Sequence, residues 1–205
     1  NHISQSLTKE TFSKNAVYVS DAGMPCVSDP GASLVEFCIQ NEIAYDVLPG
    51  ANAILTAYAM SGFSHTTFSF YGFLDHKGVS RASKLNDALN DAKLAILYES
   101  PHRLLKLLEE LSIKDANRTI FLAKEISKLH QNSYKDTALN LFEKFKDINI
   151  KGEWVVIIEP KETVGFNLDL DDILSLDIAP KIKAKLIAKM TGESIKDVYQ
   201  KLLEN

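Results

Sequence analysis

Short apolar runs alternate along most of the chain with segments whose apolar residues recur at helical spacing. The runs are typical of buried strands, and the spaced segments are typical of amphipathic helices that cover a sheet. Strands are expected over residues 16–20, 43–48, 67–73, 94–98, 119–123 and 154–159. The helices expected between them cover residues 32–40, 52–61, 80–91, 101–111 and 137–145. Strands separated by helices predict an α/β protein whose sheet has parallel character.

From about residue 165 the pattern changes to helices alone. Three are expected, over residues 169–175, 180–190 and 194–203. Gly192 is placed to end the second helix, and Ser194 is placed to cap the third. These residues therefore predict a small helical appendage.

The composition is that of an ordinary globular protein. The chain has 205 residues, of which 45% are hydrophobic and 24% charged, which excludes a disordered tail or a fibrous repeat. No apolar run approaches the ~20 residues that span a bilayer. Two cysteines are too few for a disulfide framework, so we expect a reducing, cytoplasmic setting.

The net charge of −4 is unevenly distributed along the chain. Residues 1–76 hold two basic and seven acidic side chains, whereas residues 179–201 hold six lysines against two acids. Nucleic-acid binders usually carry a basic surface, so the total argues against one. A total does not exclude a local basic patch, and a lysine run is also typical of a solvated helix face.

Several common catalytic motifs are missing from the sequence. It contains no phosphate-binding G-x-x-x-x-G-K-[ST] loop, no dinucleotide-binding G-x-G-x-x-G and no serine-hydrolase G-x-S-x-G. Neither the histidines nor the cysteines show metal-ligand spacing. The absence of these motifs argues against the corresponding enzyme classes and does not indicate another function.

Three segments at strand ends remain as candidates, because ligands of open α/β sheets bind outside the carboxyl ends of the strands. The first is the turn 20–23, where Asp21 can bind a sugar hydroxyl or simply cap its own backbone. The second is the turn 48–53, whose small side chains can admit a ligand or allow close helix packing. The third is a charged group comprising Glu99, Arg103, Lys124 and Glu125, which can serve catalysis or form surface ion pairs.

Taken together, these segments resemble one family. Val19-Ser-Asp-Ala-Gly-Met-Pro-Cys-Val-Ser-Asp-Pro-Gly31 is similar to the family's V-S-D-A-G-T-P-x-I-S-D-P-G. The other matching segments follow in the family's order: Leu48-Pro-Gly-Ala, Tyr71-Gly-Phe-Leu, Tyr98-Glu-Ser-Pro-His-Arg, Ala123-Lys-Glu-Ile-Ser-Lys and Gly152-Glu. They resemble the tetrapyrrole-methylase-like enzymes that use S-adenosylmethionine (SAM), and most closely the bacterial 16S rRNA cytidine ribose-2′-O-methyltransferases.

The resemblance implies a two-lobe α/β fold with mixed sheets and a helical appendage. We expect an N-terminal SAM-binding lobe over residues 1–65, a second lobe over 66–163 and an RNA-contacting appendage over 164–205. The family's opening strand and its P-x-G-N-L turn have no counterpart in this sequence. We therefore expect the first lobe to be incomplete in this chain.

The resemblance also implies roles for individual residues. The cofactor-binding residues are expected to be Asp21, Met24, Gly50, Ala51, Tyr98, Ala123, Glu153 and Trp154. Glu125 or Glu99 is the expected proton acceptor, with Lys124 as its positive partner, because a ribose 2′-OH is a poor nucleophile. The residues expected to contact RNA are Arg103, Lys128, Lys181, Lys183, Lys185 and Lys189.

The implied function is methyl transfer from SAM to a cytidine 2′-OH in the decoding region of 16S rRNA, with no metal. The partners implied are the rRNA or the small ribosomal subunit, with a homodimer and no membrane. One alternative is an enzyme of the same fold that methylates a small tetrapyrrole-like substrate. The other is a non-catalytic fragment that binds SAM or RNA.

Overall fold

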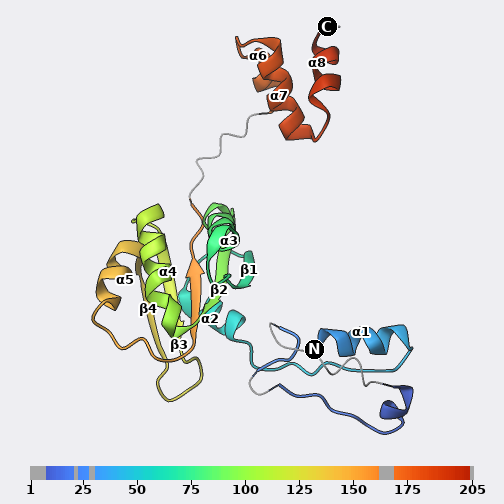
Figure 1. The fold of residues 1–205 in the computed structure, drawn as a ribbon, viewed down its shortest axis with the longest axis vertical. Helices are drawn as coiled ribbons and strands as arrows, with labels where there is room; N and C mark the ends of the chain where they lie inside the picture. The colour runs from blue at the N-terminus through green and yellow to red at the C-terminus, as the bar shows by residue number, and fades with distance from the viewer. Residues whose placement is uncertain (1–7, 21–22, 28–30, 162–168, 204–205) are drawn as a thin grey trace. The chain divides into compact units, whose positions relative to one another are not determined.

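The computed structural model describes residues 8–20, 23–27, 31–161 and 169–203. Its internal contacts divide the chain into two compact units, residues 1–161 and residues 162–205 (Figure 1). The division falls close to residue 164, where the sequence predicts that the appendage begins. The further boundary expected between residues 65 and 66 stays a prediction.

A five-stranded mixed sheet forms the centre of the first unit, in the order β1-β2-β5-β3-β4. β1 and β2 pair in parallel, and every other neighbouring pair is antiparallel. The strands are β1 (Phe68–Phe73), β2 (Leu94–Glu99), β3 (Thr119–Lys124), β4 (Asn132–Thr137) and β5 (Trp154–Ile158). The predicted α/β class with a mixed sheet is therefore confirmed.

Helices precede and connect these strands. They are the 3₁₀ helix η2 (Lys9–Phe12), α1 (Ala32–Gln40), α2 (Ala53–Ser61), α3 (Gly78–Asn90), α4 (Pro101–Lys114) and α5 (Ala138–Phe145). The α2 helix begins where it does because Asn52 caps it, with its Oδ1 accepting the N–H groups of Ile54 (2.9 Å) and Leu55 (3.1 Å). Thr137 caps α5 in the same way.

Because successive strand residues point to opposite sides, the sheet carries a separate apolar core on each face. On one face Leu97, Leu122 and Val156 pack among buried side chains of α3, α4 and α5. On the other face strand residues such as Ile96 and Phe121 pack against α2. The strand ends therefore have a different environment on each side of the sheet.

The structure corrects three expectations about strands. β4 is not predicted from the sequence, because its residues Asn132–Thr137 are polar and mostly exposed, as suits an edge strand. The strands expected over residues 16–20 and 43–48 are wrong, since both segments lack ladder pairing within the described chain. Val17 and Leu48 are accordingly 88% and 77% exposed.

The second unit contains the helices α6 (Leu170–Ser175), α7 (Pro180–Thr191) and α8 (Ile195–Leu203). Each contributes to one small core, through Ile173, Ile187 and Val198. Gly192 ends α7 with a φ of +79°, as the sequence predicts. None of the helices in the described residues of either unit is long and apolar enough to cross a membrane.

Candidate functional site

Two loops of the first unit meet through a backbone hydrogen bond. The N–H of Met24 donates to the carbonyl of Ala51 at 2.9 Å. A Cβ added at Gly23 would lie 2.9 Å from that carbonyl oxygen, and Gly23 has a φ of +78°. Gly50 packs beside Met24, with an added Cβ 3.7 Å from its Cα. Three expected cofactor residues, Met24, Gly50 and Ala51, are thus brought together, whereas Asp21 lies outside the described residues.

The remaining expected cofactor and catalytic residues lie at one end of the sheet. Glu99 on β2 and Lys124 on β3 are both paired with Trp154, the first residue of β5. One residue further into the sheet, Tyr98 and Ala123 both pair with Val155. Because paired residues point to the same face, Glu99, Trp154 and Lys124 share one side of the sheet.

Tyr98 and Ala123 belong to the face that α2 covers. Ala123 is buried, and the ring of Tyr98 packs on those of Phe70 and Phe73, with ring centroids 5.0 and 5.5 Å apart. Val27, which follows the Met24 loop, packs against the same cluster. The segment after the first loop therefore packs on the same face of the sheet as Tyr98 and Ala123.

Trp154 instead turns its side chain into the core on the opposite face. Its ring packs against Phe145 and Tyr134, and its Nε1 donates to the carbonyl of Ile150 at 2.9 Å. The side chain is thus occupied in holding β5 against α5 and β4. Trp154 therefore reaches the sheet edge chiefly through its backbone.

Glu125 is held in place directly after β3. Its backbone N–H donates to the carbonyl of Glu153 at 2.9 Å, and its Oε1 accepts the N–H of Glu153 at 2.8 Å. Lys128 Nζ lies 3.1 Å from the same oxygen and 2.8 Å from Glu153 Oε2. Lys124, Glu125, Lys128 and Glu153 therefore form one charged group at this end of the sheet.

The backbone around Glu125 is strained. Glu125 and Ser127 have φ values of 49° and 62°, which non-glycine residues rarely adopt and which occur most often at functional sites. The hydrogen bond from the backbone N–H of Glu153, followed by the contact with Lys128, lowers the pKa of Glu125. The pKa of Lys128 is raised by its hydrogen bonds to the carboxylates of Glu153 and Glu125. Both groups are charged at neutral pH.

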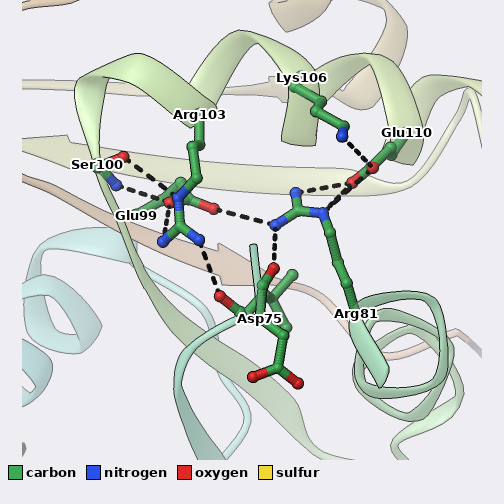
Figure 2. Close-up of polar contacts among 8 residues, drawn as sticks. Asp75, Arg81, Glu99, Ser100, Arg103, Lys106 and Glu110 are labelled. Carbon is green, nitrogen blue, oxygen red and sulfur yellow. Dashed lines mark hydrogen bonds and ion pairs between the residues drawn. The ribbon is translucent and has the colours of Figure 1, made fainter. Parts of the chain in front are cut away.

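The side chain of Glu99, the last residue of β2, belongs to a separate buried cluster together with Arg81 of α3 and Arg103 of α4 (Figure 2). Its side chain is fully buried, and its Oε1 accepts the N–H of Ser100 at 2.7 Å and lies 2.8 Å from Arg103 Nη2. Its Oε2 lies 3.7 Å from Arg81 Nη1 and has no hydrogen-bond partner within the described chain. These partners make Glu99 an anchor for the turn between β2 and α4.

Arg103 is similarly engaged within the protein. Besides Glu99, its guanidinium contacts the Ser100 hydroxyl and donates to the carbonyl of Leu74 at 2.9 Å (Figure 2). The side chain is 17% exposed. A contact of Arg103 with RNA would have to form on a group that already has three partners.

The four lysines of α7 divide into two sets. Lys181, Lys185 and Lys189 follow one another at four-residue spacing and are exposed, so they form one row along the helix. Lys183 lies off this row and is partly buried, with its Nζ donating to the carbonyl of Leu174 at 2.6 Å. The exposed row is the part of this set that can meet an external anion.

Two residues that support the site are not among those expected from the sequence. Gly152 has a φ of +110°, and a Cβ there would lie 2.7 Å from Cγ of Glu125, so the glycine makes room for that side chain. Arg81 is the buried partner of Glu99. Gly152 could have been found from the sequence, because the Gly152-Glu153 pair is one of the segments that resemble the family. No local sequence pattern indicates Arg81.

The first unit combines an α/β sheet with two joined glycine-bearing loops and charged strand ends. These features are typical of α/β enzymes that bind a ligand at the strand ends. The chain belongs to the family of tetrapyrrole (corrin/porphyrin) methylases, which it matches over residues 1–141. The predicted family is therefore confirmed, and with it a methyltransferase. A family of methylases also agrees with SAM as the expected methyl-donating cofactor.

Similar proteins include several ribosomal RNA small subunit methyltransferases I. That of Campylobacter fetus is 45% identical over 191 residues, which are 93% of this chain and 70% of that protein. That of Helicobacter pylori strain 26695 is 42% identical, over 94% of this chain and 70% of that protein. That of Thermotoga maritima is 39% identical, over 73% of this chain and 67% of that protein.

Solved structures show the same fold. A conserved hypothetical protein of Aeropyrum pernix K1 superposes with a TM-score of 0.50 and 16% sequence identity. The match covers 90% of this chain and 67% of that one. At this identity the likeness concerns the fold alone.

Proposed function

We propose that the chain transfers a methyl group from SAM to the ribose 2′-OH of a cytidine in the decoding region of 16S rRNA. The observation that carries the proposal is the junction of the two loops through Met24 and Ala51, directly before α2, which packs on the sheet face that holds Tyr98 and Ala123. The similar rRNA small subunit methyltransferases support RNA as the substrate. We further propose a cytoplasmic homodimer as the working form.

The residues around the loops fit a cofactor that needs close approach to backbone. Gly50 and Ala51 present main-chain groups at the start of α2, and Met24 closes the other side. Tyr98 and Ala123 would border the cofactor from the strand ends, Glu153 and Trp154 would do so through their backbone, and Asp21 would bind its methionine end. When bound, the sulfonium of SAM supplies a methyl group for in-line displacement, so the protein's main task is alignment.

Glu125 and Lys124 are the proposed reactive pair at the RNA hydroxyl. Oε1 of Glu125 is occupied by Glu153 and Lys128, which leaves Oε2 to accept a proton. Its lowered pKa keeps the carboxylate ionised, and Lys124 would stabilise the negative charge that develops on the oxygen. Glu99, the other expected acceptor, is less suited because it is buried between two arginines.

The second unit is proposed to bind RNA through the exposed row Lys181, Lys185 and Lys189. These ammonium groups can contact successive phosphates, which is the sequence-independent part of RNA binding. Lys128 already pairs with two glutamates, so a phosphate would compete with them for its charge. A phosphate would likewise compete with Glu99 for the charge of Arg103.

Methyl transfer to RNA tests this function. Radiolabelled SAM is incubated with the chain and naked 16S rRNA, assembled small subunits or a tetrapyrrole, and calorimetry measures SAM binding separately. We expect calorimetry to show that the chain binds SAM. We also expect radiolabel in the naked 16S rRNA, in the assembled small subunits or in both. SAM binding with transfer only to a tetrapyrrole would favour the small-substrate alternative, and binding without any transfer would favour a non-catalytic role.

The Glu125→Gln variant tests the proposed proton acceptor. Gln keeps a carbonyl that can accept the N–H of Glu153 but cannot take a proton. We expect a rate at least about 100-fold lower with unchanged SAM affinity, as for the loss of a general base. Methylation at the full rate would remove Glu125 from this role.

A further inference from the structure

An open pocket lies beside the reactive pair. It is formed by the end of β3, the turn into β4 and the loop before β5, and its volume is about 580 Å³. Its lining includes Lys124, His130, Gln131, Asn149 and Lys151. Apart from Lys124, none of these five residues belongs to the site derived above.

The acceptor atoms of the carboxamides around this pocket are already used within the protein. Oε1 of Gln131 accepts the N–H of Ser127, and Oδ1 of Asn149 accepts the N–H of Lys151 at 3.2 Å. Asn132, which also lines the pocket, accepts the N–H of Ser133 at 2.8 Å and donates to the Tyr134 hydroxyl at 3.1 Å. These groups leave little accepting capacity for a ligand.

Several side-chain hydrogen-bond donors of the pocket, in contrast, are not used within the described part of the protein. Within the described chain, the ammonium groups of Lys124 and Lys151 form no ion pair, and the carboxamide nitrogens of Gln131 and Asn149 have no hydrogen-bond partner. The ring of Trp154 lies 5.6 Å from Lys124 Nζ, which is a cation–π contact and uses no hydrogen-bond acceptor of the protein. The pocket therefore offers two cations and two amide donors.

The carboxylate of Glu125, which also borders the pocket, is largely offset by its neighbours. Lys128 and the N–H of Glu153 both contact its Oε1, and the absence of a side chain at Gly152 lets it lie against the loop. Lys124 contributes to lowering its pKa, so the two charges interact. With Lys151 included, three lysines face the two glutamates of this region.

We propose that this pocket binds a backbone phosphate of the RNA next to the nucleotide that is methylated. A site rich in donors and cations, whose carboxamide oxygens are already used within the protein, suits a ligand group that only accepts hydrogen bonds, and a phosphodiester is such a group. The proposal rests on the proposed function and adds Lys151, Gln131 and Asn149 as substrate-positioning residues.

The test uses Lys151→Gln and Asn149→Asp in the full chain. The first removes one cation, and the second keeps the acceptor for the N–H of Lys151 while replacing the donor with an anion. Affinity for a fluorescent 16S rRNA fragment is measured by anisotropy over a series of KCl concentrations. For Lys151→Gln we expect roughly fivefold to tenfold weaker binding at low salt and a salt slope lower by about 1. For Asn149→Asp we expect weaker binding still.

Lys93→Gln is the matched control, because it removes the same charge from an exposed residue just before β2, about 20 Å along that strand from its Glu99 end. RNA binding by Lys93→Gln should equal that of the wild type, and calorimetry should give all three variants wild-type SAM affinity. Wild-type RNA affinity and salt slope in Lys151→Gln and Asn149→Asp would overturn the pocket proposal alone. A wild-type chain that binds SAM but not RNA would overturn the proposed function together with it.

Discussion

Glu99 shows how a charged residue at a sheet edge can serve the fold. A carboxylate without exposed surface is costly unless charges and hydrogen bonds compensate it. Arg103 and the N–H of Ser100 compensate one oxygen, while Arg81 faces the other and also binds Glu110 at 2.8 Å. The cluster thus ties the end of β2 to both α3 and α4.

Removing the charge of Glu99 is expected to destabilise the first unit. In Glu99→Gln the two arginines lose their common buried anion, and breaking such a pair costs about 3 kcal/mol. Glu143→Gln is the control, since Glu143 pairs with Lys146 at 2.7 Å on the surface and such pairs contribute less than about 1 kcal/mol. Urea denaturation measures both free energies of unfolding. Equal losses in the two variants would contradict the anchoring role.

Tyr71 gives the first unit a dependence on alkaline pH. Burial, followed by the 2.9 Å hydrogen bond to Asp91, raises the pKa of Tyr71 from 10.0 to about 12. Because the folded-state value is the higher one, this stabilisation is complete below pH 10 and is lost as the pH rises toward 12.

The variant Tyr71→Phe tests that dependence. Its free energy of unfolding at pH 8 should be about 1 kcal/mol lower than that of the wild type, because it lacks the hydrogen bond to Asp91. The difference from the wild type should shrink between pH 10 and pH 12. Denaturant titrations across this range provide the measurement, and a difference that stays constant with pH would show that Tyr71 is not the titrating group.

Among the elements, the two joined loops matter most for the site. Gly23 and Gly50 allow the loops to approach, and Asn52 then starts α2 immediately after them. α2 packs on the sheet face that also holds Tyr98 and Ala123. The second loop therefore leads directly into the helix that covers Tyr98 and Ala123.

A side chain at Gly23 should separate these loops. In Gly23→Ala the new Cβ would lie 2.9 Å from the carbonyl oxygen of Ala51, so we expect SAM affinity to fall at least about tenfold, a loss of ~1.4 kcal/mol in binding. Gly62→Ala is the control, because it has a similar φ of +62° but no atom within 4 Å of the added Cβ. Calorimetry that finds equal SAM affinity in both variants would place the cofactor elsewhere.

The elements differ in how far the sequence predicts them. Apolar runs and caps identify β1, β2, β3, β5 and all the α-helices, because burial and capping leave local patterns. β4 leaves none, since its exposed polar residues gain their pairing from β3 alone. The segments 16–20 and 43–48 carry strand-like apolar residues, but a strand also needs a partner, and local composition does not supply one.

The site is predictable only where function has left a motif. Met24, Gly50 and Ala51 are expected from the family's motifs, whereas Tyr98, Ala123, Glu153 and Trp154 are expected from their positions at strand ends. The sequence does not distinguish Glu99 from Glu125, although one is buried between arginines and the other keeps an available oxygen. That distinction depends partly on Arg81, which α3 brings from another part of the chain.

At the scale of the whole molecule, the uneven charge follows segments of the chain and not its two units, since residues 1–161 (17 basic, 19 acidic) and residues 162–205 (6 basic, 8 acidic) each carry a net charge of −2. The acidic first residues accompany the loops proposed for the cationic cofactor, and the lysine row lies on α7 in the second unit. The proposed phosphate pocket lies in the first unit, beside Glu125. RNA binding is thus proposed to involve both units, with the reaction confined to the first.

The most direct test of this account is nucleoside analysis of 16S rRNA after incubation with the chain and isotopically labelled SAM. The RNA is digested to nucleosides, which are separated and identified by mass spectrometry. The account predicts that the label appears in 2′-O-methylcytidine. Label on a base or on another nucleoside, or no label under conditions in which SAM binds, would contradict it.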